Sequence, residues 1–273
     1  MLLNDNNNSN FIFIHANGYP PKAYKCLHDK IDKKYNLYNY LLRPLWDTKE
    51  DPNQLKDWNL FQNDFLDFLE LKNEKYIGIG HSIGGNLILR TAISNPEYFN
   101  KIILLDPTLF IPRIIYMWKL AIALNLQNKF HPWIVSTLNR KMTYKSYKDI
   151  FNSYRNKSVF SKINDKNLTY YINSITKEID NEIHITYSKK WEYQIYKTGL
   201  LGDMFIWKNI NRLNIPCLIL RAEDSNAFLN SSQAKIEKLN PKIKFKTIKE
   251  STHLFPLENP NKTFDNIESF LNY

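Results

Sequence analysis

Six short apolar segments are spaced along the chain at intervals that fit strands alternating with helices. They are Phe11–Ile14, Tyr38–Leu42, Tyr76–Gly80, Lys101–Leu105, Pro216–Leu220 and Ile243–Ile248. Helix-length segments separate the first four, and one of them, Asp57–Leu71, places Trp58, Phe61 and Phe65 on one face. Strands that alternate with helices predict an α/β fold, with about six mostly parallel strands and helices on both faces of the sheet.

The alternation stops between the fourth and fifth segments, where residues 107–212 have mainly helical patterns. The expected helices are Ile111–Leu126, Pro132–Met142, Tyr144–Arg155 and Leu168–Ile179, followed by a possible strand Ile183–Tyr187 and a helix from Lys190. A loop of that length without structure of its own would be unusual. We therefore expect residues 107–212 to form a helical cap inserted between the fourth and fifth strands, and residues 1–106 and 213–273 to form the core.

A G-x-S-x-G motif follows the third predicted strand. The residues are Gly80-His81-Ser82-Ile83-Gly84, and a helical pattern over Asn86–Ile93 comes next. Between a strand and a helix, this motif forms a sharp turn that strains the serine backbone and exposes its hydroxyl group. The N-terminus of the following helix favours negative charge that develops there. This context favours Ser82 as a nucleophile.

With this motif and two others, the chain resembles the α/β-hydrolase family. The other two are the loop His15-Ala16-Asn17-Gly18 after the first strand and the late segment H-x-x-x-x-E-x-P that begins at His253. Together with Asp106-Pro107 and Trp191-Glu192, they are similar to a bacterial branch of capped hydrolases whose substrates are unassigned. The family commonly begins with an antiparallel hairpin. Only ten residues precede Phe11, so we expect that first pair of strands to be missing or vestigial.

The resemblance implies roles for several residues. Ser82 would attack a carbonyl carbon, and His253 would take its proton. The backbone N–H groups of Asn17 and Ile83 would form the oxyanion hole. His15 would brace the oxyanion loop and adjoin the substrate pocket.

The acid that orients the histidine is not fixed by the sequence. The resemblance places an aspartate three or four residues after Ala222, but Ser225 and Asn226 occupy those positions. Asp224 lies one residue early and is our first assignment. Asp106, at the end of the fourth strand, is the alternative.

These residues predict a serine hydrolase of the esterase or lipase type that cleaves a carboxylic ester or thioester through an acyl-enzyme. A C–C bond hydrolase or an acyltransferase would use the same residues. A non-catalytic ligand-binding protein on a hydrolase scaffold is a further alternative, because no carboxylate stands at the usual offset. No phosphate-binding loop, dinucleotide-binding turn or zinc-binding helix motif is present, so we expect no cofactor and no metal.

The net charge of +10 lies in the predicted cap. Residues 107–212 contain 17 Lys and Arg against 7 Asp and Glu, so the rest of the chain is balanced. Basic and aromatic residues are interleaved in the cap, which predicts a positive mouth for an anionic acyl substrate or a weak contact with anionic lipid. A solvated basic face without a ligand is the alternative. We expect Ile115 and Trp118, on the apolar segment Ile111–Leu126, to line an acyl pocket.

No nucleic-acid-binding motif accompanies the charge, so we expect no nucleic-acid partner. The first thirty residues lack a signal-peptide pattern, and Arg113 and Lys119 interrupt the longest apolar stretch. Two cysteines are too few for a disulfide framework. We therefore expect a soluble, cytoplasmic protein. The oligomeric state is open.

Overall fold

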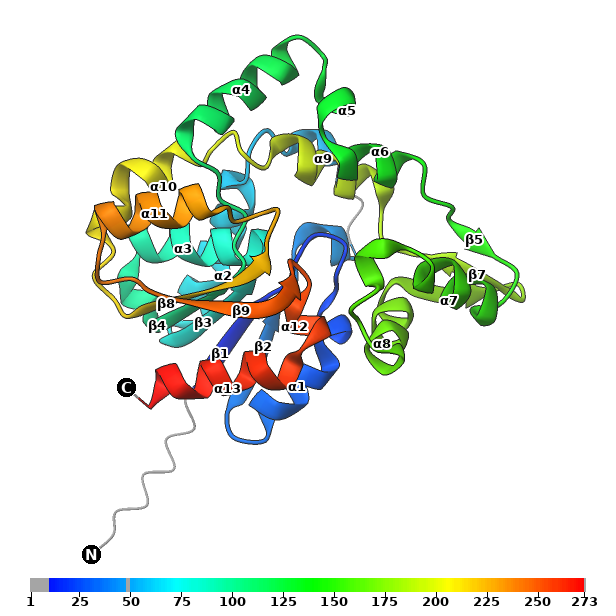
Figure 1. The fold of residues 1–273 in the computed structure, drawn as a ribbon, viewed down its shortest axis with the longest axis horizontal. Helices are drawn as coiled ribbons and strands as arrows, with labels where there is room; N and C mark the ends of the chain where they lie inside the picture. The colour runs from blue at the N-terminus through cyan, green and yellow to red at the C-terminus, as the bar shows by residue number, and fades with distance from the viewer. Residues whose placement is uncertain (1–9, 48–49, 273) are drawn as a thin grey trace, which may run out of the picture.

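A computed structural model describes residues 10–47 and 50–272 (Figure 1). Its main sheet has six strands in the order β2-β1-β3-β4-β8-β9, and every pairing between neighbours is parallel. The strands are β1 (Asn10–Ile14), β2 (Asn36–Tyr40), β3 (Tyr76–His81), β4 (Phe99–Leu105), β8 (Cys217–Asp224) and β9 (Lys244–Thr252). All six predicted strands are confirmed, and the predicted α/β class with them.

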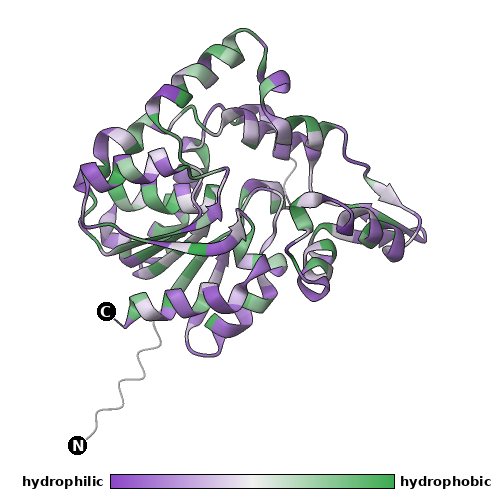
Figure 2. Cartoon of the chain, in the orientation of Figure 1, coloured by the Kyte–Doolittle hydropathy of each residue, from purple (hydrophilic) through white to green (hydrophobic). Residues whose placement is uncertain are grey.

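The central strands are buried on both faces, which explains their nearly continuous apolar sequences. In β1, Ile12 and Ile14 belong to one hydrophobic core, while Phe11 and Phe13 belong to the core on the other side of the sheet. The same alternation holds along β4 and β8. Figure 2 shows these strands in green between helices whose outer faces are purple.

Helices cover both faces of the sheet (Figure 1). On one face lie α2 (Asn59–Lys72), α3 (Ile83–Ser94) and α11 (Asn230–Leu239), and on the other lie α1 (Lys25–Asp32) and α13 (Pro260–Leu271). Helix α2 ends at Asn73, which adopts the left-handed conformation with φ 50°. The predicted three-layer arrangement is therefore confirmed.

Between β4 and β8 the chain forms the predicted helical insertion. Its helices are α4 (Pro112–Ala123), α5 (Gln127–Phe130), α6 (Pro132–Leu138), α7 (Tyr147–Arg155), α8 (Asp165–Ile175), α9 (Lys189–Thr198) and α10 (Met204–Asn209). It also contains a small antiparallel sheet of β5 (Thr143–Tyr144), β7 (Glu182–Ile185) and β6 (Thr176–Ile179). Among the described residues, no helix combines the length and apolar character needed to cross a bilayer.

One predicted helix in this insertion is wrong at its end. Helix α8 stops at Ile175, and residues 176–179 form β6 instead of continuing to Ile179. The reason is the two-residue turn Asp180-Asn181, where both residues have positive φ, 51° and 60°. Asp and Asn tolerate this conformation, which suits a tight hairpin between antiparallel strands.

The last part of the insertion packs on the core. Ile206 and Trp207 of α10 join the same hydrophobic cluster as α3. Arg90 of α3 forms a fully buried ion pair with Asp203, with 3.1 Å between Nη2 and Oδ1. The division into a core and a cap at residue 212 stays a prediction, since this end of residues 107–212 contacts the nucleophile helix directly.

Candidate active site

Ser82 stands at the turn between β3 and α3, with a backbone φ of 58° and ψ of −118°. Such a conformation is costly for a residue with a Cβ and is kept only where the surroundings enforce it. The two glycines of the motif, Gly80 and Gly84, make room for this tight turn. A Cβ on Gly80 would lie 2.3 Å from the carbonyl of Gly84, and one on Gly84 would lie 2.1 Å from the carbonyl oxygen of Ile14. The strand and the helix can therefore approach closely only with glycine at both positions.

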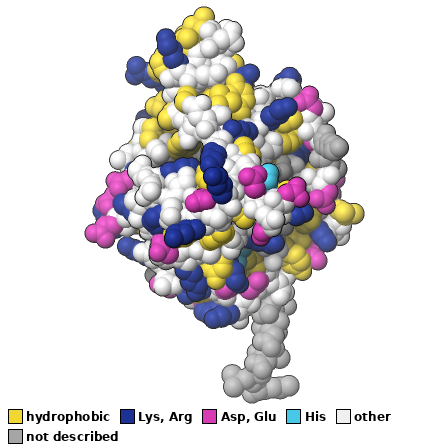
Figure 3. Space-filling model, turned by 90° about the vertical axis from the view of Figure 1, so that its right-hand side faces the viewer, with side chains coloured by type: hydrophobic (Ala, Val, Ile, Leu, Met, Phe, Trp, Pro, Cys, Tyr) yellow, Lys and Arg dark blue, Asp and Glu magenta, His cyan; other side chains and the backbone are white. Residues whose placement is uncertain are grey.

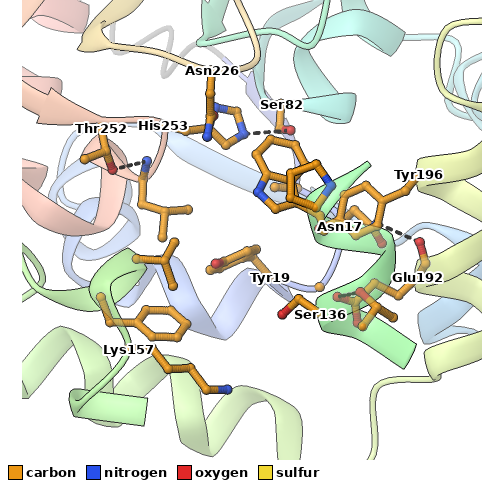
Figure 4. A pocket seen from close by; sticks show the side chains of 18 of the residues that line it. Asn17, Tyr19, Ser82, Ser136, Lys157, Glu192, Tyr196, Asn226, Thr252 and His253 are labelled. Atoms are coloured by element: carbon orange, nitrogen blue, oxygen red, sulfur yellow. Dashed lines mark hydrogen bonds between the residues drawn. The ribbon is translucent and has the colours of Figure 1, made fainter. Parts of the chain in front are cut away.

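Three side chains form a hydrogen-bonded chain at this turn. Nε2 of His253 lies 2.9 Å from Oγ of Ser82, and Nδ1 of His253 lies 2.7 Å from Oδ2 of Asp106. Since a carboxylate only accepts, Nδ1 carries the proton and Nε2 is free to accept from the serine hydroxyl group. The dashed line in Figure 4 marks the contact of His253 with Ser82.

The loop that carries His253 is held by Glu258. This carboxylate accepts hydrogen bonds from the backbone N–H and the hydroxyl group of Thr252. The glutamate of the H-x-x-x-x-E-x-P segment thus folds back to fix the residue before the histidine.

The first assignment of the acid, Asp224, is wrong, and the alternative, Asp106, occupies the position. Asp106 is fully buried at the end of β4, where its carboxylate also accepts from the backbone N–H of Ala222 at 2.9 Å and the hydroxyl group of Ser225 at 2.6 Å. Asp224 is 66% exposed and pairs with Lys162 at 3.3 Å.

The physical reason is the pairing of β4 with β8. Their carboxyl ends are neighbours, so either strand can bring a carboxylate to the histidine. Here β8 continues to Asp224, whose side chain points to solvent, and Ser225 donates to Asp106 from the position where the family resemblance placed an acid.

Thr108 is a site residue that the sequence analysis missed. Its Oγ1 lies 3.0 Å from Oγ of Ser82, and its backbone N–H donates to the carbonyl oxygen of Ser82 at 3.1 Å. Its place in the sequence could have indicated a role, because Thr108 lies two residues after Asp106, just beyond the end of a central strand.

The two residues of the predicted oxyanion hole lie in different elements, and Asn17 lines the same cavity as Ser82. Ile83 begins α3, where backbone N–H groups have no partner within the helix, and Asn17 lies in the loop after β1. No hydrogen bond in the described part of the chain uses either N–H group. The Asn17 side chain is clamped by the insertion, because it donates to the carbonyl oxygen of Glu192 at 3.1 Å and accepts from the Tyr187 hydroxyl group at 3.2 Å.

His15 braces this loop but does not line the pocket, so that part of its assignment is wrong. Its Nε2 accepts from the backbone N–H of Leu42 at 3.3 Å, and its Nδ1 donates to the carbonyl oxygen of Ala16 at 2.8 Å. Burial lowers the pKa of His15 to about 4, so the ring is neutral near pH 7.

A second hydrogen-bonded chain joins the oxyanion loop to the histidine loop. The backbone N–H of Ala16 donates to the Tyr24 hydroxyl oxygen at 3.2 Å, and that hydroxyl group lies 2.7 Å from Nδ1 of His81. Nε2 of His81 lies 2.8 Å from the carbonyl oxygen of His253. Because this carbonyl only accepts, Nε2 carries the proton and Tyr24 donates to Nδ1. Burial lowers the pKa of His81 well below its usual value, which keeps it neutral.

A cavity of about 750 Å³ lies above Ser82, between the core and the insertion (Figure 4). Asn17, Tyr19 and His253 line it from the core, and residues of α6, α7, α8 and α9 line it from the insertion. In the described ranges, no three His, Cys, Asp or Glu side chains are placed to hold a metal ion.

Comparison with protein families agrees with the observed fold. A family model described as serine aminopeptidase, S33, matches residues 50–260. The chain belongs to this family of α/β-hydrolases. Comparison with curated proteins gave no match.

Solved structures similar to this S33-family chain are α/β-hydrolases at low sequence identity. An E-2-(acetamidomethylene)succinate hydrolase is 16% identical with a TM-score of 0.76, over 97% of this chain and 92% of that one. A hydrolase from Rickettsia typhi is 17% identical with a TM-score of 0.75, over 98% of this chain and 87% of that one. A thioesterase domain from the curacin biosynthetic pathway is 11% identical with a TM-score of 0.75, over 96% of this chain and 92% of that one. These likenesses establish the fold.

The pocket of this S33-family hydrolase is not built from the predicted apolar helix. Ile115 is fully buried in the core cluster, and Trp118 donates its indole N–H to the carbonyl oxygen of Lys197 at 3.0 Å. Neither residue lines the cavity, so both assignments are wrong. Trp133 of α6 lines it instead and stacks on His253, with ring centroids 6.1 Å apart. Helix α4 projects to the outer edge of the molecule, away from α7 and α8 (Figure 1), and none of its residues is among those that line the cavity.

Proposed function

We propose that this α/β-hydrolase cleaves a carboxylic ester or thioester through an acyl-enzyme formed on Ser82. The observation that carries the proposal is the continuous chain of hydrogen bonds from Ser82 through His253 to Asp106 at a strained turn. A serine hydroxyl group is a poor nucleophile unless a base takes its proton, and the imidazole here is oriented to do so.

The proposed reaction begins when Oγ of Ser82 attacks the carbonyl carbon and Nε2 of His253 takes the hydroxyl proton. Asp106 stabilises the imidazolium ion and keeps the required tautomer. The tetrahedral oxyanion accepts hydrogen bonds from the N–H groups of Asn17 and Ile83. The imidazolium then protonates the departing alcohol or thiol. Water, deprotonated by the same histidine, hydrolyses the acyl-enzyme and restores the serine.

The position of Asp106 also bears on the non-catalytic alternative. That alternative arose from the missing carboxylate at the usual offset, and Asp106 supplies a buried carboxylate from the neighbouring strand. This favours an enzyme over a binding protein.

A fluorophosphonate probe tests the proposal together with turnover of short p-nitrophenyl esters. We expect the probe to label Ser82, and Ser82→Ala to lose both labelling and turnover. Ser136 lines the same cavity, so Ser136→Ala is the matched control and should keep the label. An unlabelled wild-type protein, or unchanged ester turnover by Ser82→Ala, would contradict the proposal.

Product analysis separates hydrolysis from acyl transfer. If a large excess of alcohol or amine diverts most of the acyl group from water, the enzyme is an acyltransferase. A C–C bond hydrolase would show labelling at Ser82 but would turn over ketone substrates in place of esters. The predicted cytoplasmic location stays a prediction.

A further inference from the structure

Among the described residues, four charged side chains line the cavity besides His253, and only one of them has no ion-pair partner. Arg140 pairs with Glu192, and both side chains are nearly buried. Asp224 pairs with Lys162 at the rim. Lys157 lines the same cavity without an acidic partner among the residues that the structure describes.

The surroundings of Lys157 are aromatic. Its Nζ lies 3.9 Å from the ring centroid of Tyr154, which stacks on Phe160 at 5.4 Å. Tyr171 lies 5.2 Å from Phe160 and stacks on Tyr19 at 4.7 Å. These four rings form one wall of the cavity. Burial raises the pKa of Tyr19 and Tyr171, so the wall carries no negative charge near neutral pH.

The half-buried ammonium group of Lys157 faces aromatic rings and the cavity, and no carboxylate of the described chain pairs with it. Burial and the nearby positive charge of Arg140 lower the pKa of Lys157. Two further polar atoms of lining residues, the Tyr154 hydroxyl group and Nε of Arg140, are buried and have no hydrogen-bond partner in the described chain. Because these two atoms are buried, the group at the cavity surface that suits a bound anion is the unpaired ammonium of Lys157.

We propose that Lys157 binds a carboxylate group carried by the substrate, so that the natural substrate is an acidic ester or thioester. Figure 4 shows Lys157 across the cavity from Ser82 and Glu192, with Tyr19 between them, and the hydrolysed bond and the carboxylate would therefore lie at opposite ends of one molecule. The guanidinium of Arg140 is unsuitable for this role because it already donates to Glu192 and to the carbonyl oxygen of Tyr187. The proposal rests on the proposed function, since it names the substrate class of that site.

Matched esters that differ only in the distal charge test the proposal. The probes are p-nitrophenyl hydrogen glutarate, adipate and suberate, each compared with its distal methyl ester, which is neutral. Wild-type enzyme should prefer the acidic member of at least one pair. Lys157→Met should lower the ratio of kcat/KM for acidic against neutral ester by about 10- to 100-fold, since hydrogen bonds to charged groups contribute about this much.

Lys148→Met is the matched control, because Lys148 is exposed on α7 and does not line the cavity. It removes the same charge from the same helical region and should keep the wild-type ratio. A binding measurement removes the dependence on turnover. Calorimetric titration of Ser82→Ala with each of the three acidic esters should give, for at least one of them, a Kd that rises at least tenfold when Lys157→Met is added.

The outcomes separate this proposal from the proposed function. Ester turnover with a ratio near one for every pair, or a ratio that Lys157→Met does not change, would overturn the role of Lys157 and leave the hydrolase intact. Loss of ester turnover and of Ser82 labelling in the wild-type protein would contradict the hydrolase proposal itself. The titration of Ser82→Ala would still report whether Lys157 binds an acidic ligand.

Discussion

Oγ1 of Thr108 lies 3.0 Å from Oγ of Ser82, close enough for the two hydroxyl groups to share a hydrogen bond. When Ser82 donates to His253, Thr108 can donate to Ser82, and this fixes the direction of the attacking oxygen. Thr108→Val should lower kcat about fivefold with little change in KM, since a hydrogen bond between neutral groups contributes about 1 kcal/mol. Thr108→Ser should restore most of the rate. Steady-state kinetics of both variants on one ester is the measurement, and equal losses in both would exclude a role for the hydroxyl group.

Replacing Asp106 should be far more damaging than replacing Asp224. Asp106→Asn should lower the acylation rate by about 10⁴, because the imidazole would be held in the wrong tautomer. Asp224→Asn removes only an exposed ion pair and should change the rate less than threefold. Pre-steady-state bursts of p-nitrophenol would measure both acylation rates. A larger loss of acylation rate in Asp224→Asn than in Asp106→Asn would mean that Asp224, at the end of β8, is the acid that orients His253.

The Tyr24 hydroxyl group links the oxyanion loop to the histidine loop through His81. Tyr24→Phe keeps the ring packing but leaves the Ala16 N–H and Nδ1 of His81 without their partner. We expect kcat to fall about tenfold at unchanged KM, because the donor and the base would no longer be held in one arrangement. The fluorophosphonate labelling rate should fall in parallel. A loss of stability without a change in labelling rate would limit Tyr24 to a packing role.

His28 should make the fold sensitive to acid. Burial lowers its pKa to about 3, and its Nε2 has no hydrogen-bond partner in the described structure. Between pH 6.5 and 3 the unfolded chain therefore binds a proton that the folded chain does not, so the free energy of unfolding falls as the pH falls. The ring packs edge-on against Phe13 with centroids 4.5 Å apart.

His28→Phe keeps an aromatic ring there and removes this proton. Urea unfolding at pH 7, 6, 5 and 4 should show a slope shallower by up to about 1.4 kcal/mol per pH unit than in the wild-type protein. If the free energy of unfolding changed with pH in the same way in both proteins, His28 would not contribute to the acid sensitivity of the fold.

Contact of the insertion with anionic lipid stays a prediction, and the structure directs its test to α4. Tyr116, Met117 and Leu120 are about 60% exposed, and residues 107–148 contain basic but no acidic side chains. Figure 3 shows apolar and basic side chains together at the top of the molecule, where α4 and α5 project. Phosphatidylglycerol vesicles should sediment the protein at low salt, and neutral phosphatidylcholine vesicles should not.

A double variant on α4 provides the matched comparison for this test. Met117→Ser with Leu120→Ser should weaken the binding to anionic vesicles. Leu71→Ser should not, although Leu71 is 83% exposed, because it belongs to the core and lies at the C-terminal end of α2. Equal binding by all three proteins would remove α4 as the contact surface.

The local sequence determined the strands, most of the helices and the nucleophile turn. A strand buried on both faces needs apolar residues at every position, and these stand out in the segments that became β1, β3, β4 and β8. Gly80 contacts Gly84 within the motif, and Gly84 contacts Ile14 in the adjacent strand. The G-x-S-x-G spacing was therefore enough to predict that Ser82 stands at a sharp turn. His253 was predicted because its H-x-x-x-x-E-x-P segment resembles a motif of the family.

The carboxylate, the pocket walls and the unpaired lysine were decided only by the tertiary structure. Asp106 and Asp224 end two adjacent strands, and the choice depends on how far β8 continues and which side chain turns inward. The lining of the cavity depends on how the insertion folds over the core, which brings Trp133 and Lys157 into the wall of the cavity and leaves Ile115 and Trp118 outside it. Such contacts join residues far apart in the chain, and no local pattern of hydrophobic and polar positions encodes them.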